Sequence, residues 1–162
     1  DYMVLHTNSA EAMRIDSIGA VTKPKQPAFL AYPASQQSNL SSGDDLVFGT
    51  EVADRNADYN ASTGVFTAPV TGLYHMGFSL RLQELANDST YVLVTIAASN
   101  RTFYYIFDAG TMDEYAAYYE MNGSYLVDMD ASDTAKVQYT QSGGDFTTDF
   151  STASYFYGYL VC

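Results

Sequence analysis

Short runs of alternating apolar and polar residues recur along most of this chain, and they constrain its fold more than any other feature. In the clearest run, 73–83, every second residue from Tyr74 to Leu82 is aromatic or aliphatic. A period of two indicates a β-strand with one buried face. The run follows a Pro-x-x-Gly sequence at 69–72, which predicts a hairpin turn.

Other strand-like segments lie at 28–32, 46–52, 64–67, 91–98, 102–107, 123–129, 135–141 and 154–161. The stretches between them are rich in Gly, Asp, Asn and Ser, which favour turns. Only 113–121 has a composition compatible with a turn or two of helix. Many short strands joined by polar turns predict an all-β sandwich or barrel, most simply an antiparallel jelly roll.

Composition limits the kinds of partner that the chain can have. Its 162 residues, 47% of them hydrophobic, suffice for one domain with its own core. The net charge of −12 repels phosphate backbones, so we expect no nucleic-acid partner. No apolar run approaches the roughly 20 residues of a membrane helix, so we expect no membrane insertion. The single cysteine, Cys162, excludes an intrachain disulfide.

Residues 1–26 differ from the rest of the chain. Short alternating runs surround a Ser-Ile-Gly turn at 17–19, and the Pro-rich sequence KPKQP follows. This segment is too short to bury a core of its own, so we interpret it as the end of a longer structure. The linker is placed at 22–27, and the main domain at 27–162.

The last strand has two apolar faces. Phe156, Gly158, Leu160 and Cys162 share one face, which the parity predicts to point into the core. The opposite face carries Tyr155, Tyr157, Tyr159 and Val161. A solvated sheet face is normally polar, so we expect a neighbouring subunit to cover the tyrosines. An exposed, Tyr-rich edge is the alternative.

Spaced aromatic residues and glycines over 48–78 resemble the signature of complement C1q-like domains. The matching positions are Phe48, Asp54, Tyr59, Phe66, Gly72, Tyr74, Met76 and Phe78, with Met76 where the family usually has Phe. The closing segment SYFYGYL at 154–160 also resembles the family's last strand. The resemblance implies a ten-stranded antiparallel C1q/TNF jelly roll, a homotrimer, and a recognition head without catalytic activity.

The N-terminal segment EAMRIDSIGAVTKPKQPAF at 11–29 resembles the shaft-to-tip junction of bacteriophage tail fibres, especially those of marine and cyanobacterial phages. No Gly-X-Y stalk precedes the domain. The resemblance implies a short β fragment of a fibre shaft at 1–26 and a receptor-binding head at the distal end of a virion's tail fibre. Its partner would be a host surface glycan or lipopolysaccharide. The alternatives are a secreted animal-type C1q-like head, a structural virion decoration and a glycan-hydrolysing tip.

We find no motif for an active site. The two histidines, His6 and His75, do not form a metal-binding or catalytic spacing, and no nucleophile elbow or phosphate loop occurs. Carboxylate pairs are frequent, as expected from 19 acidic residues. A glycosidase with two tip carboxylates is the most plausible enzyme, but we predict a binding protein.

Strand order predicts which loops lie together. Consecutive loops of an antiparallel jelly roll alternate between its ends, so 33–45, 83–90, 108–117 and 142–153 should lie away from the linker. Their acids include Glu84, Asp88 and Asp149. Acids beside aromatic rings suit sugar recognition, and the predicted receptor-binding residues are Asp113, Tyr115, Asp145 and Phe146. The alternative is that these loop tips are simply solvated.

The family resemblance also implies a possible calcium site near the apex. Its ligands would be Asp108, Asp113 and Glu114, which supply the hard oxygen atoms that calcium prefers. Their spacing differs from that of the family. No other cofactor is expected.

Overall fold

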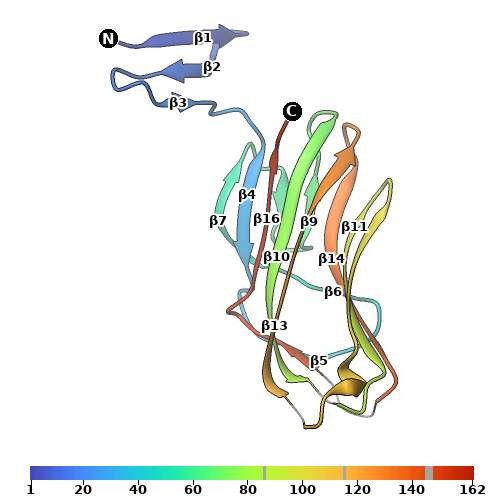
Figure 1. Ribbon diagram of the computed structural model, residues 1–162. Coiled ribbons are helices and arrows are strands. Elements are labelled where there is room, and N and C mark those ends of the chain that lie inside the picture. The colour runs from blue at the N-terminus through green and yellow to red at the C-terminus, as the bar shows by residue number, and fades with distance from the viewer. Residues whose placement is uncertain (86, 115, 145–147) are drawn as a thin grey trace.

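The computed structural model describes residues 1–85, 87–114, 116–144 and 148–162, and its secondary structure is almost entirely β-strand. Two antiparallel sheets lie face to face in a main domain, and a small separate sheet lies beyond one end of it (Figure 1). Within these ranges the one helical element is the 3₁₀ turn η1 (Ala109–Thr111). Among these residues no helix is both long and apolar enough to cross a bilayer.

The small N-terminal sheet contains three strands in chain order: β1 (Met3–Thr7), β2 (Ala10–Ile15) and β3 (Val21–Thr22). The first main sheet has seven strands, with the order β5 (Gln37–Leu40), β15 (Thr148–Phe150), β10 (Gly72–Leu85), β16 (Tyr155–Leu160), β4 (Ala28–Tyr32) and β7 (Thr50–Arg55), while β13 (Ala116–Met129) pairs with β10. The second has six, with the order β12 (Thr102–Phe107), β11 (Tyr91–Ala98), β14 (Thr134–Ser142), β9 (Val65–Thr67) and β8 (Tyr59–Asn60), while β6 (Asp44–Asp45) pairs with β14.

The predicted antiparallel jelly roll is confirmed, with more than ten strands because short segments such as β6 and β8 also pair. The described residues at 116–121 form no helical turn, because β13 begins at Ala116 and pairs with β10. One predicted strand, 46–52, is shorter than expected. Residues 46–49 lie outside any strand although Leu46 and Phe48 are buried in the core, and β7 begins at Thr50.

Stacked aromatic side chains form the core between the two sheets. Phe29 lies at its centre, with ring centroids 4.8 Å from Tyr59, 5.0 Å from Phe66 and 4.9 Å from Phe156. The Tyr59 hydroxyl donates a hydrogen bond to the carbonyl oxygen of Phe48 at 3.0 Å, which satisfies its polar end inside the core. The spaced aromatics of the sequence are therefore packing residues.

A glycine in the last strand makes this packing possible. A Cβ atom on Gly158 would lie 2.8 Å from Cε1 of Phe29, closer than real side chains approach. The inward parity of Phe156 and Gly158 is confirmed. The prediction for Cys162 is wrong: it is exposed, because β16 ends at Leu160 and the carbonyl oxygen of Cys162 accepts a hydrogen bond from the amide of Leu73.

An acidic turn precedes β8. Asp54 accepts hydrogen bonds from the amides of Asp58 and Tyr59 at 3.2 Å and 3.1 Å, so its carboxylate holds the turn in place. The neighbouring Asp58 is half-buried, and its Oδ2 atom is buried without a hydrogen-bond partner. Burial, together with the negative charge of Asp54, raises the pKa of Asp58, although a hydrogen bond with Asn56 opposes the shift.

We predict that Asp58→Asn stabilises the domain at neutral pH. Because the pKa of Asp58 is higher in the folded than in the unfolded chain, its ionisation costs stability, progressively as the pH rises through the folded pKa. The gain at pH 7 should be up to roughly 1 kcal/mol after solvent screening, or about 2–4 °C in Tm. Thermal unfolding at pH 7 and at about pH 3 would measure it. An equal gain at both pH values would show that ionisation of Asp58 is not the cause.

Candidate functional site

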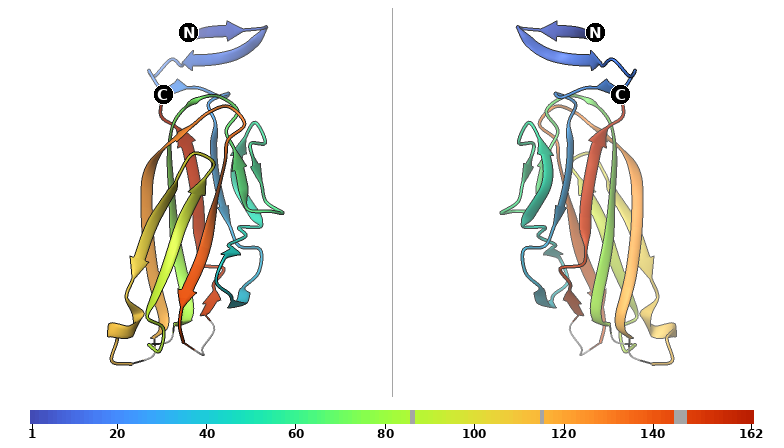
Figure 2. Two further views of the ribbon diagram at one scale, coloured as in Figure 1. Left: turned by 90° about the vertical axis from the view of Figure 1, so that its right-hand side faces the viewer. Right: turned by 90° about the vertical axis from the view of Figure 1, so that its left-hand side faces the viewer.

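The loops at the end of the domain opposite the N-terminal sheet are joined by hydrogen bonds between distant parts of the chain. Asn87 Nδ2 donates to the carbonyl oxygens of Met112 and Asp113 at 3.3 Å, and the amide of Thr90 donates to the carbonyl oxygen of Ser142 at 2.8 Å. Figure 2 shows these loops together at the distal end of the long strands.

Of the four residues predicted to bind a receptor, Asp113 lies among the described residues at this end. Tyr115, Asp145 and Phe146 lie outside the described residues. Asp113 is exposed, and its backbone is held by Asn87. Their role in receptor binding stays a prediction.

A polar hollow of about 200 Å³ opens at the distal end of the seven-stranded sheet. Residues from the segments around all four distal loops line it. Its lining consists of Gln36, Gln83, Glu84, Ala117, Tyr118 and Asp149. We call it the distal hollow.

The carboxylate of Asp149 forms the fixed part of the distal hollow. It accepts hydrogen bonds from Gln36 Nε2 at 2.5 Å, Ser38 Oγ at 3.3 Å and the amide of Asn39 at 2.8 Å. These bonds join β15 to the residues around the start of β5. The acid is therefore oriented before any ligand arrives.

Glu84 contributes the second carboxylate of the distal hollow. Its backbone φ of 58° lies in the left-handed region that favours glycine, although the residue stands inside β10. Strained backbone of this kind concentrates at binding and catalytic sites. The side chain is exposed and has no hydrogen-bond partner among the described residues, so it is free to accept bonds from a ligand.

The rest of the lining of the distal hollow includes a side-chain amide and an aromatic ring. Gln83 lies opposite Tyr118 in the β10–β13 register, and the Tyr118 side chain is 66% exposed. Carboxylate acceptors, an amide donor and an exposed aromatic ring thus lie beside one another. This combination suits a ligand with hydroxyl groups and an apolar face. Glu84 and Asp149 lie in the predicted distal loops, whereas Tyr118 lies just beyond them, in the segment whose composition is compatible with a turn or two of helix.

The residues considered for calcium lie on the surface of the distal loops. Asp108, Asp113 and Glu114 are all exposed. In the part of the chain that the structure describes, no three acidic, histidine or cysteine side chains gather closely enough to hold a metal ion. Calcium binding by these three residues stays a prediction.

The outer face of the seven-stranded sheet carries the three tyrosines of β16. Tyr155 and Tyr159 are 43% and 47% exposed, and Tyr157 is half-buried because it leans over Gly77. A Cβ atom on Gly77 would lie 2.4 Å from the Tyr157 hydroxyl oxygen. Leu126, which is in register with His75 on the next strand, extends this apolar surface. We call it the tyrosine face.

A second apolar surface lies on the edge formed by β12 and β13. Tyr104 and Ile106 of β12 are both exposed. The Tyr125 hydroxyl of β13 donates a hydrogen bond to the carbonyl oxygen of Tyr104 at 2.7 Å and joins the two strands. The domain thus presents two different apolar patches, one on a sheet face and one on an edge.

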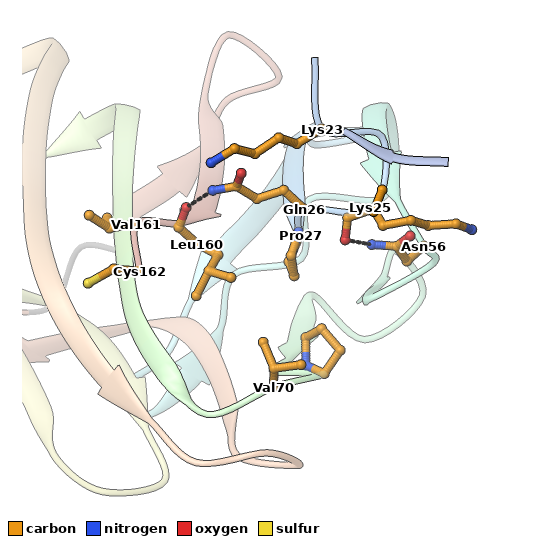
Figure 3. Close-up of a pocket in the computed structure, with 11 residues that line it drawn as sticks. Lys23, Lys25, Gln26, Pro27, Asn56, Val70, Leu160, Val161 and Cys162 are labelled. Atoms are coloured by element: carbon orange, nitrogen blue, oxygen red, sulfur yellow. Dashed lines mark hydrogen bonds between the residues drawn. The ribbon is translucent and has the colours of Figure 1, made fainter. Parts of the chain in front are cut away.

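A cavity of about 580 Å³ lies where the linker meets the base of the domain (Figure 3). Gln26 Nε2 donates a hydrogen bond to the carbonyl oxygen of Leu160 at 2.6 Å, and Asn56 Nδ2 donates to the carbonyl oxygen of Lys25 at 3.1 Å. Arg55 also donates to the carbonyl oxygen of Lys23 at 3.1 Å. The linker is therefore bonded to the domain along its length.

Two antiparallel sheets around an aromatic core define a jelly-roll head of the C1q/TNF type. Residues 28–161 match the family model of the C1q domain, and the chain belongs to this family. The fold is similar to the globular domain of zebrafish complement 1qA, with a TM-score of 0.65, 15% identity, and coverage of 85% of this chain and 98% of that one.

Two further solved structures share the fold. The TNF protein Eiger of S. frugiperda has a TM-score of 0.64 and 10% identity over 85% of this chain and 94% of its own. Murine APRIL has a TM-score of 0.57 and 14% identity over 84% of this chain and 98% of its own. At these identities the likeness concerns the fold alone.

Proposed function

We propose that the chain is a trimeric recognition head that binds neutral sugars on a host surface, at the distal end of a phage tail fibre. The observation that carries this proposal is the distal hollow, to which the segments around all four distal loops contribute. Binding residues on loops held by a rigid scaffold are the usual arrangement in recognition domains.

The charge and lining of the distal hollow indicate the class of ligand. Among the described residues that line it are two carboxylates and no lysine or arginine. In a chain of net charge −12, a phosphorylated or carboxylated sugar would be repelled. A neutral sugar has hydroxyl groups to donate to Glu84 and Asp149 and an apolar face for Tyr118.

Two apolar patches support a trimer. A closed ring of three subunits uses a heterologous interface, in which one patch on each subunit meets a different patch on the next. The tyrosine face and the exposed β12 edge are such a pair of unlike surfaces. The interface residues that we propose on β16 are Tyr155, Tyr157 and Tyr159. Three copies of a weak sugar site then act together by avidity.

The position of the N-terminal sheet supports a fibre tip. It lies beyond the base of the domain, at the end opposite the distal hollow (Figure 1). A shaft attached there leaves the distal end free to meet a cell. Immunogold labelling of phage particles with antibodies against the head tests this location, and label on the capsid instead of the fibre ends would contradict it.

We predict that Glu84→Gln and Tyr118→Ala each weaken sugar binding at least tenfold, which corresponds to about 1.4 kcal/mol. The first removes a charged acceptor without changing the backbone, and the second removes the stacking surface. Binding of the purified chain to an array of neutral and anionic oligosaccharides measures this loss.

The matched control for the acid is Glu51→Gln, an exposed glutamate on β7. It should bind like the wild type. If both distal variants remain trimeric and bind fully, the distal hollow is not the site. If the wild type binds only anionic sugars, the proposed ligand class is wrong. Release of shorter sugars from the array would identify a hydrolase.

A further inference from the structure

The N-terminal sheet has one face that is apolar except at its Thr7 end. In its register Met3 lies opposite Ile15, Leu5 opposite Met13, and Ile15 opposite Val21, so all five side chains share a face. The other face carries Val4, Arg14 and Thr22, with the Arg14 guanidinium 5.0 Å from the Tyr2 ring centre. We call the first of these the apolar wall, comprising Met3, Leu5, Met13, Ile15 and Val21.

The apolar wall is largely exposed in the single chain, with Met13 and Ile15 half-buried. Met3, Leu5 and Val21 are 55%, 54% and 52% exposed, and no residue from 1 to 22 is buried. A small sheet with a bare apolar face is marginal in water and needs packing on that face. The wall contains no ionisable group, so copies of it can approach one another without charge repulsion.

The sheet is also held in a defined place. The linker after β3 is bonded to the head through Arg55 and Asn56, and through Gln26 to Leu160. Within the sheet, Asp16 Oδ1 accepts hydrogen bonds from the amides of Ile18 and Ala20 at 2.9 Å and fixes the β2–β3 turn. Three heads related by a three-fold axis therefore bring three such sheets around the same axis.

We propose that the apolar walls of three chains pack against one another and form a closed three-walled prism on the axis of the head trimer. This inference rests on the proposed trimer, because only a shared axis supplies the other two walls. The apolar wall of each chain is thus covered by the N-terminal sheets of the two neighbouring copies. Their polar faces, with the Arg14–Glu11 ion pair, remain in water.

The test compares adjacent positions on opposite faces of β1 in the full chain. Leu5→Asp places a charge in the prism and should raise the dissociation constant of the trimer at least tenfold, as measured by sedimentation equilibrium. Val4→Asp is the matched control, because it makes the same kind of change on the other face. We expect it to leave the trimer close to wild type.

A cross-linking experiment does not depend on a destabilising change. In a Cys162→Ser background, which removes the exposed native thiol, Leu5→Cys should give covalent dimers with a short bismaleimide, and Val4→Cys should not. Equal effects at positions 4 and 5, or a Leu5→Cys trimer that does not cross-link, would overturn the prism and leave the head trimer standing. A monomeric wild type would overturn both.

Discussion

Replacing Tyr157 by aspartate should convert the trimer into monomers at micromolar concentration. Tyr157 lies at the centre of the tyrosine face, between Tyr155 and Tyr159, so a carboxylate there would be buried in the interface without a partner. An uncompensated buried charge costs about 3–5 kcal/mol, and the cost recurs at each of three contacts. Sedimentation should give about three times 17.8 kDa for the wild type and 17.8 kDa for the variant.

Two further variants distinguish loss of trimer assembly from loss of folding. Tyr159→Asp changes a more exposed side chain and should also dissociate the trimer, while circular dichroism shows that the strands are retained. Ala131→Asp adds the same charge in an exposed turn at the base and should remain trimeric. A wild-type chain that sediments as a monomer, or a Tyr157→Asp chain that stays trimeric, would remove the proposed interface.

Truncating Phe29 to alanine should lower the free energy of unfolding by about 3–5 kcal/mol, the largest loss we expect from a single core position. Its ring contacts Tyr59, Phe66 and Phe156, and its removal leaves a cavity that two hydrogen-bonded sheets cannot close. Chemical denaturation, monitored by circular dichroism, gives the free energy directly.

Phe29→Leu keeps most of the volume and should cost clearly less than Phe29→Ala. A surface change, Tyr2→Ala, should have little effect, because the Tyr2 ring is exposed and lies beside the Arg14 guanidinium, outside the core. Similar losses for Phe29→Ala and Phe29→Leu would mean that the stacking, and not the filled volume, stabilises the core.

The strands were predictable where one face is buried, because burial imposes the period of two. Tyr74, Met76, Phe78, Leu80 and Leu82 are all buried, as their alternation indicated. For the strand at 116–129, the sequence predicts only the second half, 123–129. Tyr118 and Tyr119 follow two alanines, so the first half shows no clear alternation of apolar and polar residues. β13 is instead fixed by its long pairing with β10, which depends on residues far away in the sequence.

The distal hollow could not be derived from the sequence for the same reason. Gln36 and Asp149 are separated by 113 positions and meet only because β5 pairs with β15. The backbone conformation of Glu84 has no sequence signal, since glutamate is not a residue that favours positive φ. The local pattern places Glu84 and Asp149 in the distal loops, and the tertiary pairing decides which side chains become neighbours.

The bonds between the linker and the last strand determine how the head would carry a mechanical load. The amide of Leu160 donates to the carbonyl oxygen of Pro27, just before β4, which then pairs with β16. The strands of the head run along its long axis (Figure 2). If a receptor grips the distal end while a shaft pulls at the linker, tension runs parallel to β4. The hydrogen bonds to its neighbours then resist in shear, all at once, and do not unzip one after another.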